Sequence, residues 1–365
     1  MSLEKVSNAG VSIWLDDLSR ERLKRDGNAT YLKDLIDFSH VVGVTTNPAI
    51  FSAAIAKSSL YIDDIKALAS KGLNPEEIIT ELTTSDVRSA CELFLPVFEK
   101  TNGVDGRVSI EVDPRLARSI DETVKQALFL SDKVAMPNVL IKIPATIEGL
   151  SAIRTLTAAG ISINVTIIFS VKRYQEVLES FLLGLEDRLQ NGLEISKIHS
   201  VASFFVSRVD TEIDSRLDMA NLGKLKGMAA LANARLAYEH FSEVRNTARW
   251  QKISSQGGNL QRPLWASTGV KDPSYDPTLY VLDLVASDTV NTMPENTLNS
   301  VRTSDKFGGD TINGTYSHAL EHLNQLKSIG IDIEEVALKL ESEGIEKFIN
   351  PWNELISVVE RASLA

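Results

Sequence analysis

Lys142 is the residue whose surroundings point most directly to chemistry. It lies within residues 139–145 (VLIKIPA), a run of aliphatic and β-branched residues that predicts a buried strand. A buried lysine is costly unless it is paired or neutralised, and desolvation lowers the pKa of such an amine. A neutral amine can attack a carbonyl carbon and form a Schiff base. The other interpretation is a lysine at a strand end whose amine reaches water along its aliphatic stem.

Polar residues also occur at or near the ends of other apolar runs. They are Asp16, Asn47, Glu111, Asn164, Thr166, Ser203 and Ser267. Each has a structural alternative: Asp16 or Asp17 could cap a following helix, Asn47 before Pro48 fits a helix N-cap, and Asn164 could hydrogen-bond within the core. Barrel enzymes place catalytic side chains at the carboxyl ends of parallel strands. The recurrence of polar residues at these ends therefore indicates one shared site.

Eight short apolar runs form the frame that would position these residues. The runs are 11–16, 41–47, 107–112, 139–145, 162–168, 198–204, 263–267 and 289–293. They alternate mostly with amphipathic helical stretches, which predicts an α/β protein with a parallel sheet. Their number favours a (β/α)₈ TIM barrel over an open doubly wound sheet. No glycine-rich phosphate loop follows the first run, which weakens the dinucleotide-binding alternative.

Several connections are longer than a minimal barrel of about 250 residues requires. Residues 54–101 are predicted to hold at least two helices, and residues 208–249 a long helical region. Residues 315–365 are predicted to form C-terminal helices packed on the barrel. With no repeat or linker in the sequence, we expect residues 1–365 to form a single barrel domain.

Composition narrows the class of protein. The chain has 365 residues and a net charge of −11 without a basic cluster, so nucleic acid is not an expected partner. Cys91 is the one cysteine, which excludes a disulfide within the chain and predicts an inert core residue. No apolar run is long enough to span a membrane, and the N-terminus lacks a secretory core. We therefore expect a cytoplasmic protein.

His318 and His322 have the i, i+4 spacing of a metal-binding pair on a predicted helix. No carboxylate or thiol arrangement supports a metal there, so we interpret this segment as a surface helix. Schiff-base chemistry requires no metal, and no cofactor is expected.

Two segments resemble signatures of the transaldolase family. Residues 43–51 (GVTTNPAIF) resemble the family's strand-two signature, and residues 139–150 (VLIKIPATIEGL) resemble its Schiff-base lysine signature. Residues 107–113 (RVSIEVD) resemble the strand of the family's catalytic glutamate. Residues 164–166 and 203–208 resemble the next two active-site segments. The resemblance extends from the first strand to at least Ser267, and it implies a (β/α)₈ barrel.

The resemblance also implies roles. Lys142 would form the Schiff base, Asp16 would take the proton during carbon–carbon cleavage, and Glu111 would act as acid and base through a water held with Thr166. The substrate-binding residues would be Asn47, Thr45, Ser109, Asn164, Thr166, Ser203, Phe205, Arg208, Ser267 and Lys271. Matching Leu15-Asp16 to the end of the first strand favours Asp16 over Asp17, which then becomes the helix cap.

The residues expected to bind the substrate phosphate depart from the family pattern. Arg208 follows strand six at a helix start, where an anion would be bound, although it could instead pair with Glu212. Other transaldolases carry a second arginine after strand seven, whereas this chain has ASTGVK at residues 266–271. Lys271 could replace that arginine as a point charge. This departure indicates a longer, divergent subgroup.

The activity implied is transfer of a dihydroxyacetone unit between sugar phosphates in the pentose phosphate pathway. Donors would be sedoheptulose 7-phosphate or fructose 6-phosphate, and acceptors glyceraldehyde 3-phosphate or erythrose 4-phosphate. One alternative is a class I Schiff-base aldolase acting on fructose 6-phosphate or a related sugar, because the same lysine serves both. Another is a non-catalytic sugar-phosphate-binding barrel, which would require the loss of Lys142, Glu111 or Asp16.

Overall fold

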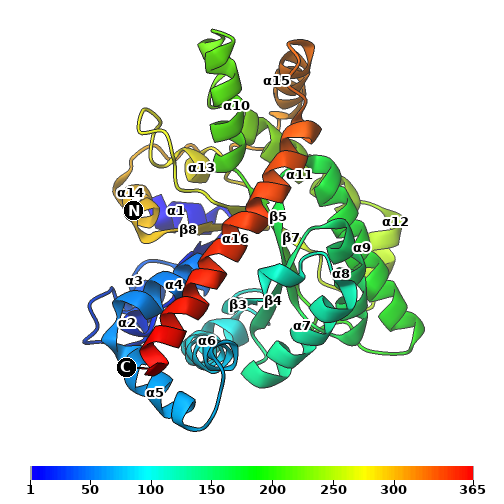
Figure 1. Ribbon diagram of the computed structural model, residues 1–365. Coiled ribbons are helices and arrows are strands. Elements are labelled where there is room, and N and C mark those ends of the chain that lie inside the picture. The colour runs from blue at the N-terminus through cyan, green and yellow to red at the C-terminus, as the bar shows by residue number, and fades with distance from the viewer. Residues whose placement is uncertain (1, 365) are drawn as a thin grey trace.

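Eight parallel strands close into a barrel, in chain order, in the computed structural model, which describes residues 2–364 (Figure 1). The strands are β1 (Val11–Leu15), β2 (Val41–Val44), β3 (Arg107–Glu111), β4 (Val139–Pro144), β5 (Ile163–Ile168), β6 (Ser200–Phe205), β7 (Arg262–Ala266) and β8 (Thr289–Met293). Each overlaps one of the eight predicted runs, and β1 pairs with β8 to close the barrel. The predicted (β/α)₈ architecture is confirmed.

Helices surround the strands and extend the connections. Those before β3 are α1 (Ser2–Asn8), α2 (Arg20–Leu23), α3 (Leu32–Phe38), α4 (Pro48–Lys57), η1 (Ser59–Tyr61), α5 (Ile62–Ser70) and α6 (Pro75–Lys100). Those between β3 and β6 are η2 (Pro114–Leu116), α7 (Ile120–Val134), α8 (Ile147–Ala159) and α9 (Val171–Gln190). Those after β6 are α10 (Ser207–Met219), η3 (Gly223–Leu225), α11 (Ala229–Arg245), α12 (Ala248–Ser254), α13 (Leu279–Leu282), α14 (Glu295–Thr303), α15 (Tyr316–Ser328) and α16 (Ile333–Leu364). The region predicted to be helical at 208–249 is thus divided among α10, α11 and α12.

Close packing between β1 and β2 explains the glycine of the 43–51 motif. Trp14 is fully buried in β1. A Cβ atom on Gly43 would lie 2.5 Å from Trp14 Cε2, which is closer than real Cβ contacts. Only glycine therefore fits at this point of β2 without moving the indole, and the two strands that lead to Asp16 and Asn47 are held in contact.

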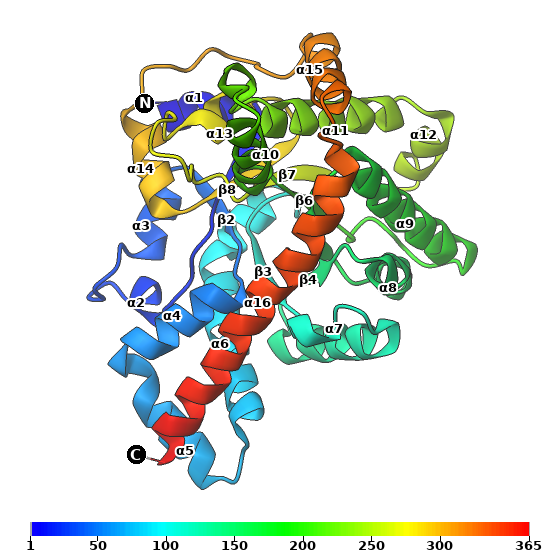
Figure 2. The same cartoon turned by 45° about the horizontal axis from the view of Figure 1, so that its top comes forward.

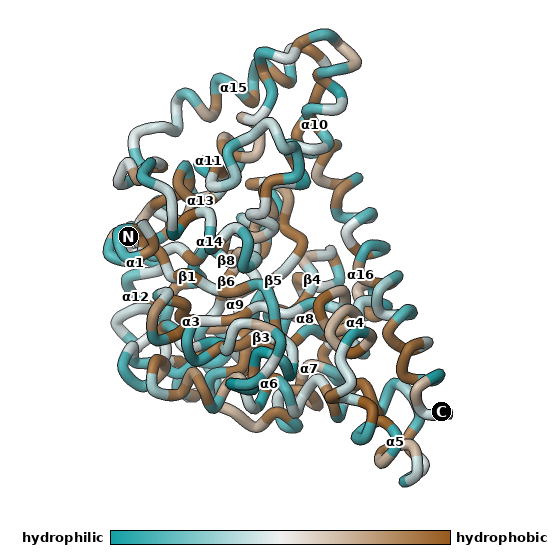
Figure 3. The backbone as a smooth tube through the Cα atoms, turned by 90° about the vertical axis from the view of Figure 1, so that its left-hand side faces the viewer, coloured by the Kyte–Doolittle hydropathy of each residue, from teal (hydrophilic) through white to brown (hydrophobic). Residues whose placement is uncertain are grey.

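The last helix, α16, crosses the barrel from the α10 and α15 side to α4 and α5 (Figures 1 and 2). Hydrophobic and hydrophilic residues alternate along it (Figure 3), as expected for a helix with one buried face. Its buried residues are Val336, Ala337, Leu340, Glu341, Gly344, Ile345, Phe348, Leu355 and Val359. The predicted C-terminal helices are present as α15 and α16, whereas a single domain over residues 1–365 stays a prediction.

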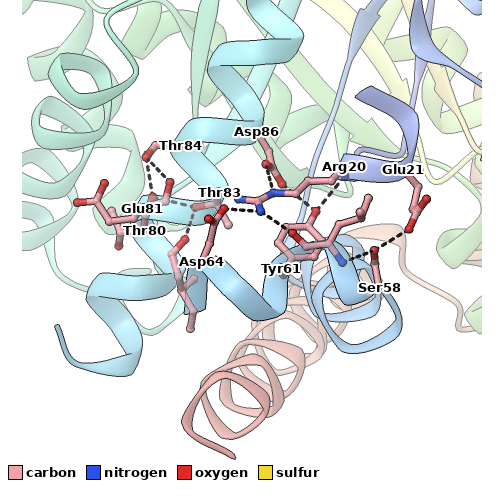
Figure 4. A network of polar contacts seen from close by, with 12 residues as sticks. Arg20, Glu21, Ser58, Tyr61, Asp64, Thr80, Glu81, Thr83, Thr84 and Asp86 are labelled. Atoms are coloured by element: carbon pink, nitrogen blue, oxygen red, sulfur yellow. Dashed lines mark hydrogen bonds and ion pairs between the residues drawn. The ribbon is translucent and has the colours of Figure 1, made fainter. Parts of the chain in front are cut away.

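A polar network fixes the segment that follows β1 (Figure 4). Arg20 donates to Asp86 of α6 at 3.0 Å and to Asp64 of α5 at 2.6 Å, and the Tyr61 hydroxyl donates to Asp86 at 2.8 Å. Asp86 is buried, which raises the pKa of its carboxyl, while the Arg20 charge opposes that rise. The network ties α2 to α5 and α6 and so holds the chain just beyond Asp16.

The structure also places Cys91 and the two histidines of α15, and it shows the length and polarity of the helices. Cys91 is buried in α6, as expected. His318 and His322 lie on α15, a helix with mostly exposed residues, which agrees with the interpretation of a surface helix; His318 is exposed, whereas His322 is only 6% exposed. Its apolar neighbours turn that side of α15 toward α11. No helix within residues 2–364 is long and apolar enough to cross a bilayer.

Candidate active site

Lys142 lies near the carboxyl end of β4, between the carboxyl end of β3 and the beginning of β5. In the strand register it pairs with Glu111 on one side and with Asn164 on the other. The residue is 5% exposed. Its Nζ donates to the Thr46 carbonyl oxygen at 3.0 Å and lies 3.4 Å from Glu111 Oε2. The amine is therefore held in a buried position by one hydrogen bond and one ion pair.

Glu111 is the carboxyl group that contacts this amine. Burial raises the pKa of its carboxyl to about 7, and the Lys142 charge opposes part of that rise. Its Oε2 atom, although it contacts Lys142 Nζ, has no hydrogen-bond partner of good geometry within residues 2–364. Thr166 Oγ1 on β5 is likewise buried without a partner among these residues. A carboxyl group with a pKa near 7 can both donate and accept a proton at neutral pH.

Asp16 follows β1 directly and faces the same space. Its Oδ1 accepts a hydrogen bond from Thr45 Oγ1 at 2.6 Å, and Thr45 Oγ1 is also 2.7 Å from Thr292 Oγ1. Burial raises the pKa of the Asp16 carboxyl, and the Lys142 charge opposes this. Lys142 is thus accompanied by two carboxyl groups that hold protons more readily than they would in water.

The prediction that Asp17 caps a helix is wrong. The residue at the N-cap of α2 is Ser19, and Asp17 instead forms an ion pair with the buried Arg22 at 2.6 Å. Arg22 also bonds Glu295 at 2.7 Å, so Asp17 belongs to a separate ionic cluster. Asp16, not Asp17, faces Lys142.

A buried chain of hydrogen bonds links three strands beside the lysine. Ser203 Oγ donates to Asn164 Oδ1 at 2.7 Å, and Asn164 Nδ2 donates to Ser109 Oγ at 3.0 Å. The alternative that Asn164 hydrogen-bonds within the core is thus realised. The chain fixes the orientation of the amide, because both ends of the Asn164 side chain have a partner.

A cavity of about 180 Å³ lies above Lys142. Its lining includes the predicted residues Asp16, Thr45, Asn47, Lys142, Ser203, Phe205, Arg208, Ser267 and Lys271. The other predicted residues, Ser109, Glu111, Asn164 and Thr166, are not part of the lining. The contacts described above place Glu111, Asn164 and Ser109 beside the lysine and the lining Ser203, so they support the cavity from β3 and β5.

Asn47 has two roles that the sequence left open. Its Oδ1 accepts from the Ile50 amide at 3.0 Å, so it is the N-cap of α4, with Pro48 at the first helical position. Asn47 also lines the cavity. The cap fixes the side chain and leaves its amide nitrogen as a possible donor to a ligand.

Arg208 lies in the first turn of α10 and lines the cavity. Glu212, its alternative partner, instead bonds Arg216 at 2.9 Å and Lys339 at 2.7 Å. Arg208 Nη1 is buried without a hydrogen-bond partner within residues 2–364, and burial lowers the pKa of the guanidinium. Lys271 is exposed at the rim of the same cavity. These two cations can meet an anionic group of a ligand.

Sequence reasoning missed Phe348 of α16. Its ring centre is 5.5 Å from Lys142 Nζ and 6.0 Å from Arg208 Cζ, and it lines the cavity. The other lining residues that were not predicted are Ala266, Gly269, Thr292 and Pro294. No local pattern singles out Phe348, because it is one of many apolar residues on an amphipathic helix.

Within residues 2–364 no group of three His, Cys, Asp or Glu residues could hold a metal.

Comparisons with known proteins agree with this geometry. The family model described as Transaldolase/Fructose-6-phosphate aldolase matches residues 13–359. A protein named Transaldolase from Mycobacterium tuberculosis is 53% identical over 97% of this chain and 95% of its own length. Proteins of the same name from Renibacterium salmoninarum and Thermobifida fusca are 53% and 51% identical, each over 98% of this chain and over 96% and 97% of their own lengths. With its barrel, its buried lysine and these relatives, the chain belongs to the transaldolase/fructose-6-phosphate aldolase family.

Proposed function

We propose that this chain is a transaldolase that moves a dihydroxyacetone unit from a ketose phosphate to an aldose phosphate through a Schiff base on Lys142. Sedoheptulose 7-phosphate and fructose 6-phosphate are the proposed donors, with glyceraldehyde 3-phosphate and erythrose 4-phosphate as acceptors. The observation that carries the proposal is the buried Lys142 amine between two carboxyl groups of raised pKa, beneath a cavity with two cations.

The first half of the reaction forms the Schiff base. The Lys142 amine attacks the ketone carbon of the donor, and Glu111 donates a proton to the resulting hydroxyl so that it leaves as water. The iminium that remains withdraws electrons from the neighbouring carbon–carbon bond. The unpartnered oxygens of Glu111 and Thr166 support a water held between β3 and β5, which would relay this proton.

The second half breaks and remakes the carbon–carbon bond. Asp16 takes the proton from the hydroxyl on the carbon beyond that bond, the bond breaks, and the shortened aldose leaves. The three-carbon unit stays on Lys142 as an enamine. It adds to the aldehyde carbon of the acceptor while Asp16 returns the proton to the new hydroxyl. Water, activated by Glu111, then releases the new ketose.

The remaining residues orient the two substrates. Asn47 and Asn164 are proposed to bind hydroxyls of the three-carbon unit, with Ser203 fixing the Asn164 amide and Ser109 completing the chain. Thr45 holds Asp16. Arg208 and Lys271 are proposed to bind the substrate phosphate, and Phe205 and Ser267 line the same cavity. The Arg208 guanidinium can donate two parallel hydrogen bonds to the phosphate, whereas the Lys271 ammonium contributes a point charge.

The class I aldolase alternative uses the same lysine and differs in how the three-carbon unit leaves. An aldolase releases free dihydroxyacetone to water, whereas a transaldolase requires an aldose acceptor. Mixing fructose 6-phosphate with erythrose 4-phosphate therefore separates them. We expect sedoheptulose 7-phosphate to form much faster than free dihydroxyacetone. Faster release of dihydroxyacetone, with or without the acceptor, would instead identify an aldolase.

The adjacent aspartates supply a matched pair of variants for the proposed chemistry. Asp16→Asn should still form the Schiff base but lose carbon–carbon cleavage by about 10²–10⁴-fold, the usual loss for a positioned base. Asp17→Asn removes a carboxylate that pairs with Arg22 and should leave cleavage close to wild type. Transfer rates and borohydride-trapped adduct are measured for both variants. Normal cleavage in Asp16→Asn with loss in Asp17→Asn would contradict the assignment of the base.

A further inference from the structure

A second polar cluster lies at the opposite, amino-terminal ends of the strands. Arg107 and Arg262 are the first residues of β3 and β7, and His199 immediately precedes β6. Arg107 and Glu111 are at opposite ends of β3, four residues apart, which corresponds to roughly 13 Å along a strand. The residues of this cluster do not line the cavity above Lys142.

The arginines of this cluster differ in how they are compensated. Arg262 bonds Asp105 at 3.0 Å and Ser12 at 2.7 Å. Arg245, at the end of α11, borders the same end of the barrel and pairs with Asp288 at 2.5 Å. Arg107 has no carboxylate within ion-pair distance among residues 2–364. It donates instead to the Gly103 carbonyl at 2.7 Å and the Pro137 carbonyl at 3.3 Å. The charge of Asp105 acts on Arg107 without forming an ion pair, and the Phe98 ring centre lies 4.8 Å from Arg107 Cζ. Arg107 is therefore the arginine of this cluster that has no ion pair within residues 2–364.

That guanidinium also has an unused donor. Arg107 is 1% exposed, and its Nη2 has no hydrogen-bond partner within residues 2–364. Burial and the charge of Arg262 lower the pKa of Arg107 to about 9. Burial, Arg107 and Arg262 likewise lower the pKa of His199 to about 3. A buried charge without a counterion is costly, so the surroundings of Arg107 favour an anion.

Two cavities, of about 290 and 580 Å³, both have Arg107 and His199 in their walls. The nitrogens of the two side chains border a common point. A Cβ atom on Gly103 would lie 3.1 Å from His199 Nε2 and 3.3 Å from Arg107 Nη2. Gly103 has a positive φ of 83°, and it keeps this side of both nitrogens free of a side chain.

We propose that this junction binds an oxyanion of the phosphate class, either inorganic phosphate or a phosphate monoester, with Arg107 Nη2 and His199 Nε2 as ligands. Guanidinium groups suit phosphate because they donate parallel hydrogen bonds to its oxygens. A bound anion would balance Arg107 and allow His199 to take up a proton and donate as well. The cavities leave room for the organic part of a monoester.

The competing account is that Arg107 only closes the bottom of the barrel through its bonds to Gly103 and Pro137. Only the proposed oxyanion site predicts saturable binding of phosphate; a purely structural role of Arg107 predicts none. The cavity above Lys142 has its own cations, so the titration uses the double variant Arg208→Ala, Lys271→Ala, which removes both proposed phosphate ligands there. Calorimetric titration with inorganic phosphate, at an ionic strength held constant with KCl, should still give one saturable site.

Variants then locate that site. Both variants are made in the double-variant background. Arg107→Lys keeps the positive charge but loses the parallel N–H donors of the guanidinium, and His199→Gln removes the imidazole nitrogen Nε2 that is the second proposed ligand. Each should raise the Kd for phosphate about tenfold or more, as expected for a charge-assisted bond. Arg154→Gln, which alters an exposed arginine paired with Asp187, is the matched control and should leave the Kd unchanged. If Arg107→Lys does not fold, His199→Gln decides the question.

The same titration with glucose 6-phosphate identifies the source of the anion. A tighter Kd than that of phosphate assigns a monoester, and a weaker one assigns inorganic phosphate. The proposal is overturned if the double variant shows no saturable binding, or if binding is the same in His199→Gln and its parent. Because the readout is binding to an enzyme with an altered active site, it does not depend on the proposed transfer activity.

Discussion

At the scale of single residues, the site depends on protons that its carboxyl groups retain. Glu111 is held beside Lys142 in a buried position, and burial moves the pKa of its carboxyl from 4.5 to about 7. A carboxylate with an ordinary pKa would be ionised at neutral pH and could not donate a proton to a leaving hydroxyl. The burial that raises this pKa therefore supports the proposed acid step, and it also destabilises the native state in which Glu111 is ionised.

The stability of the protein should show this cost. The native state retains the Glu111 proton up to about pH 7, whereas the unfolded state releases it near pH 4.5. The contribution of the protonated Glu111 carboxyl to the unfolding free energy is therefore fully present below pH 4.5, and it is lost as the pH rises through 7. Between pH 4.5 and 8 the unfolding free energy of Glu111→Gln should increase relative to wild type by about 3 kcal/mol.

Denaturant unfolding of the two proteins from pH 4.5 to 8 measures this difference. Glu122→Gln, an exposed acid on α7, is the control and should follow wild type throughout. A constant difference between Glu111→Gln and wild type across this range would mean that Glu111 titrates normally.

At the scale of elements, α16 completes the site from a distant part of the chain. Phe348 places its ring 5.5 Å from Lys142 Nζ, so the ring lies close to the cationic iminium of the proposed intermediate. Gly344, one turn earlier, faces Ile167 and Phe169 at the end of β5, where an added Cβ atom would make ordinary contacts at 3.6 Å. The helix therefore covers the cavity and brings an aromatic ring to it.

Removing the ring should weaken the intermediate. A cation–π contact of about 0.5–2 kcal/mol predicts that Phe348→Ala lowers the fraction of iminium trapped by borohydride roughly two- to thirtyfold. It should also raise the release of free dihydroxyacetone relative to transfer, because water reaches the imine. Phe348→Leu should restore the cover but not the ring contact. Leu338→Ala, at an exposed position of α16, should behave as wild type. Equal trapping in all four proteins would exclude a role for the ring.

Local patterns predicted most elements, and long-range contacts account for the exceptions. The strand runs were found because buried parallel strands are rich in aliphatic and β-branched residues. Asp17 was misassigned because its spacing suits a cap, whereas the contact with Arg22 depends on the folded chain. Phe348 was missed because a ring 206 residues after Lys142 reaches it only through the path of α16. The burial of His322, about which the sequence made no prediction, depends on packing between α11 and α15.

At the scale of the whole molecule, the barrel separates the end that holds Lys142, the candidate active site, from an end occupied by Arg107 and His199. The network around Asp86 joins outer helices to the segment after β1, so that the end that holds Lys142 does not rest on strands alone. Asp86 is buried and Asp64 is exposed, yet both bond the same guanidinium of Arg20. This arrangement allows a buried and an exposed ion pair to be compared on one arginine.

Asp86→Ala should destabilise the protein by about 3 kcal/mol, because removal of one partner leaves Arg20 and Tyr61 without their buried acceptor. Asp64→Ala removes an exposed partner and should cost about 0–1 kcal/mol. Denaturant unfolding at pH 7 measures both. Equal losses of unfolding free energy in the two variants would show that burial of an ion pair does not determine how much it stabilises the protein.

The proposed transfer reaction depends on the covalent bond that Lys142 is proposed to form with the ketose. Reduction with borohydride in the presence of fructose 6-phosphate converts a Schiff base into a stable amine, which peptide mapping assigns to one residue. We predict a three-carbon adduct on Lys142 in the wild type and none in Lys142→Arg, because a guanidinium stays protonated. An adduct on another lysine, or no adduct in the wild type, would contradict the mechanism.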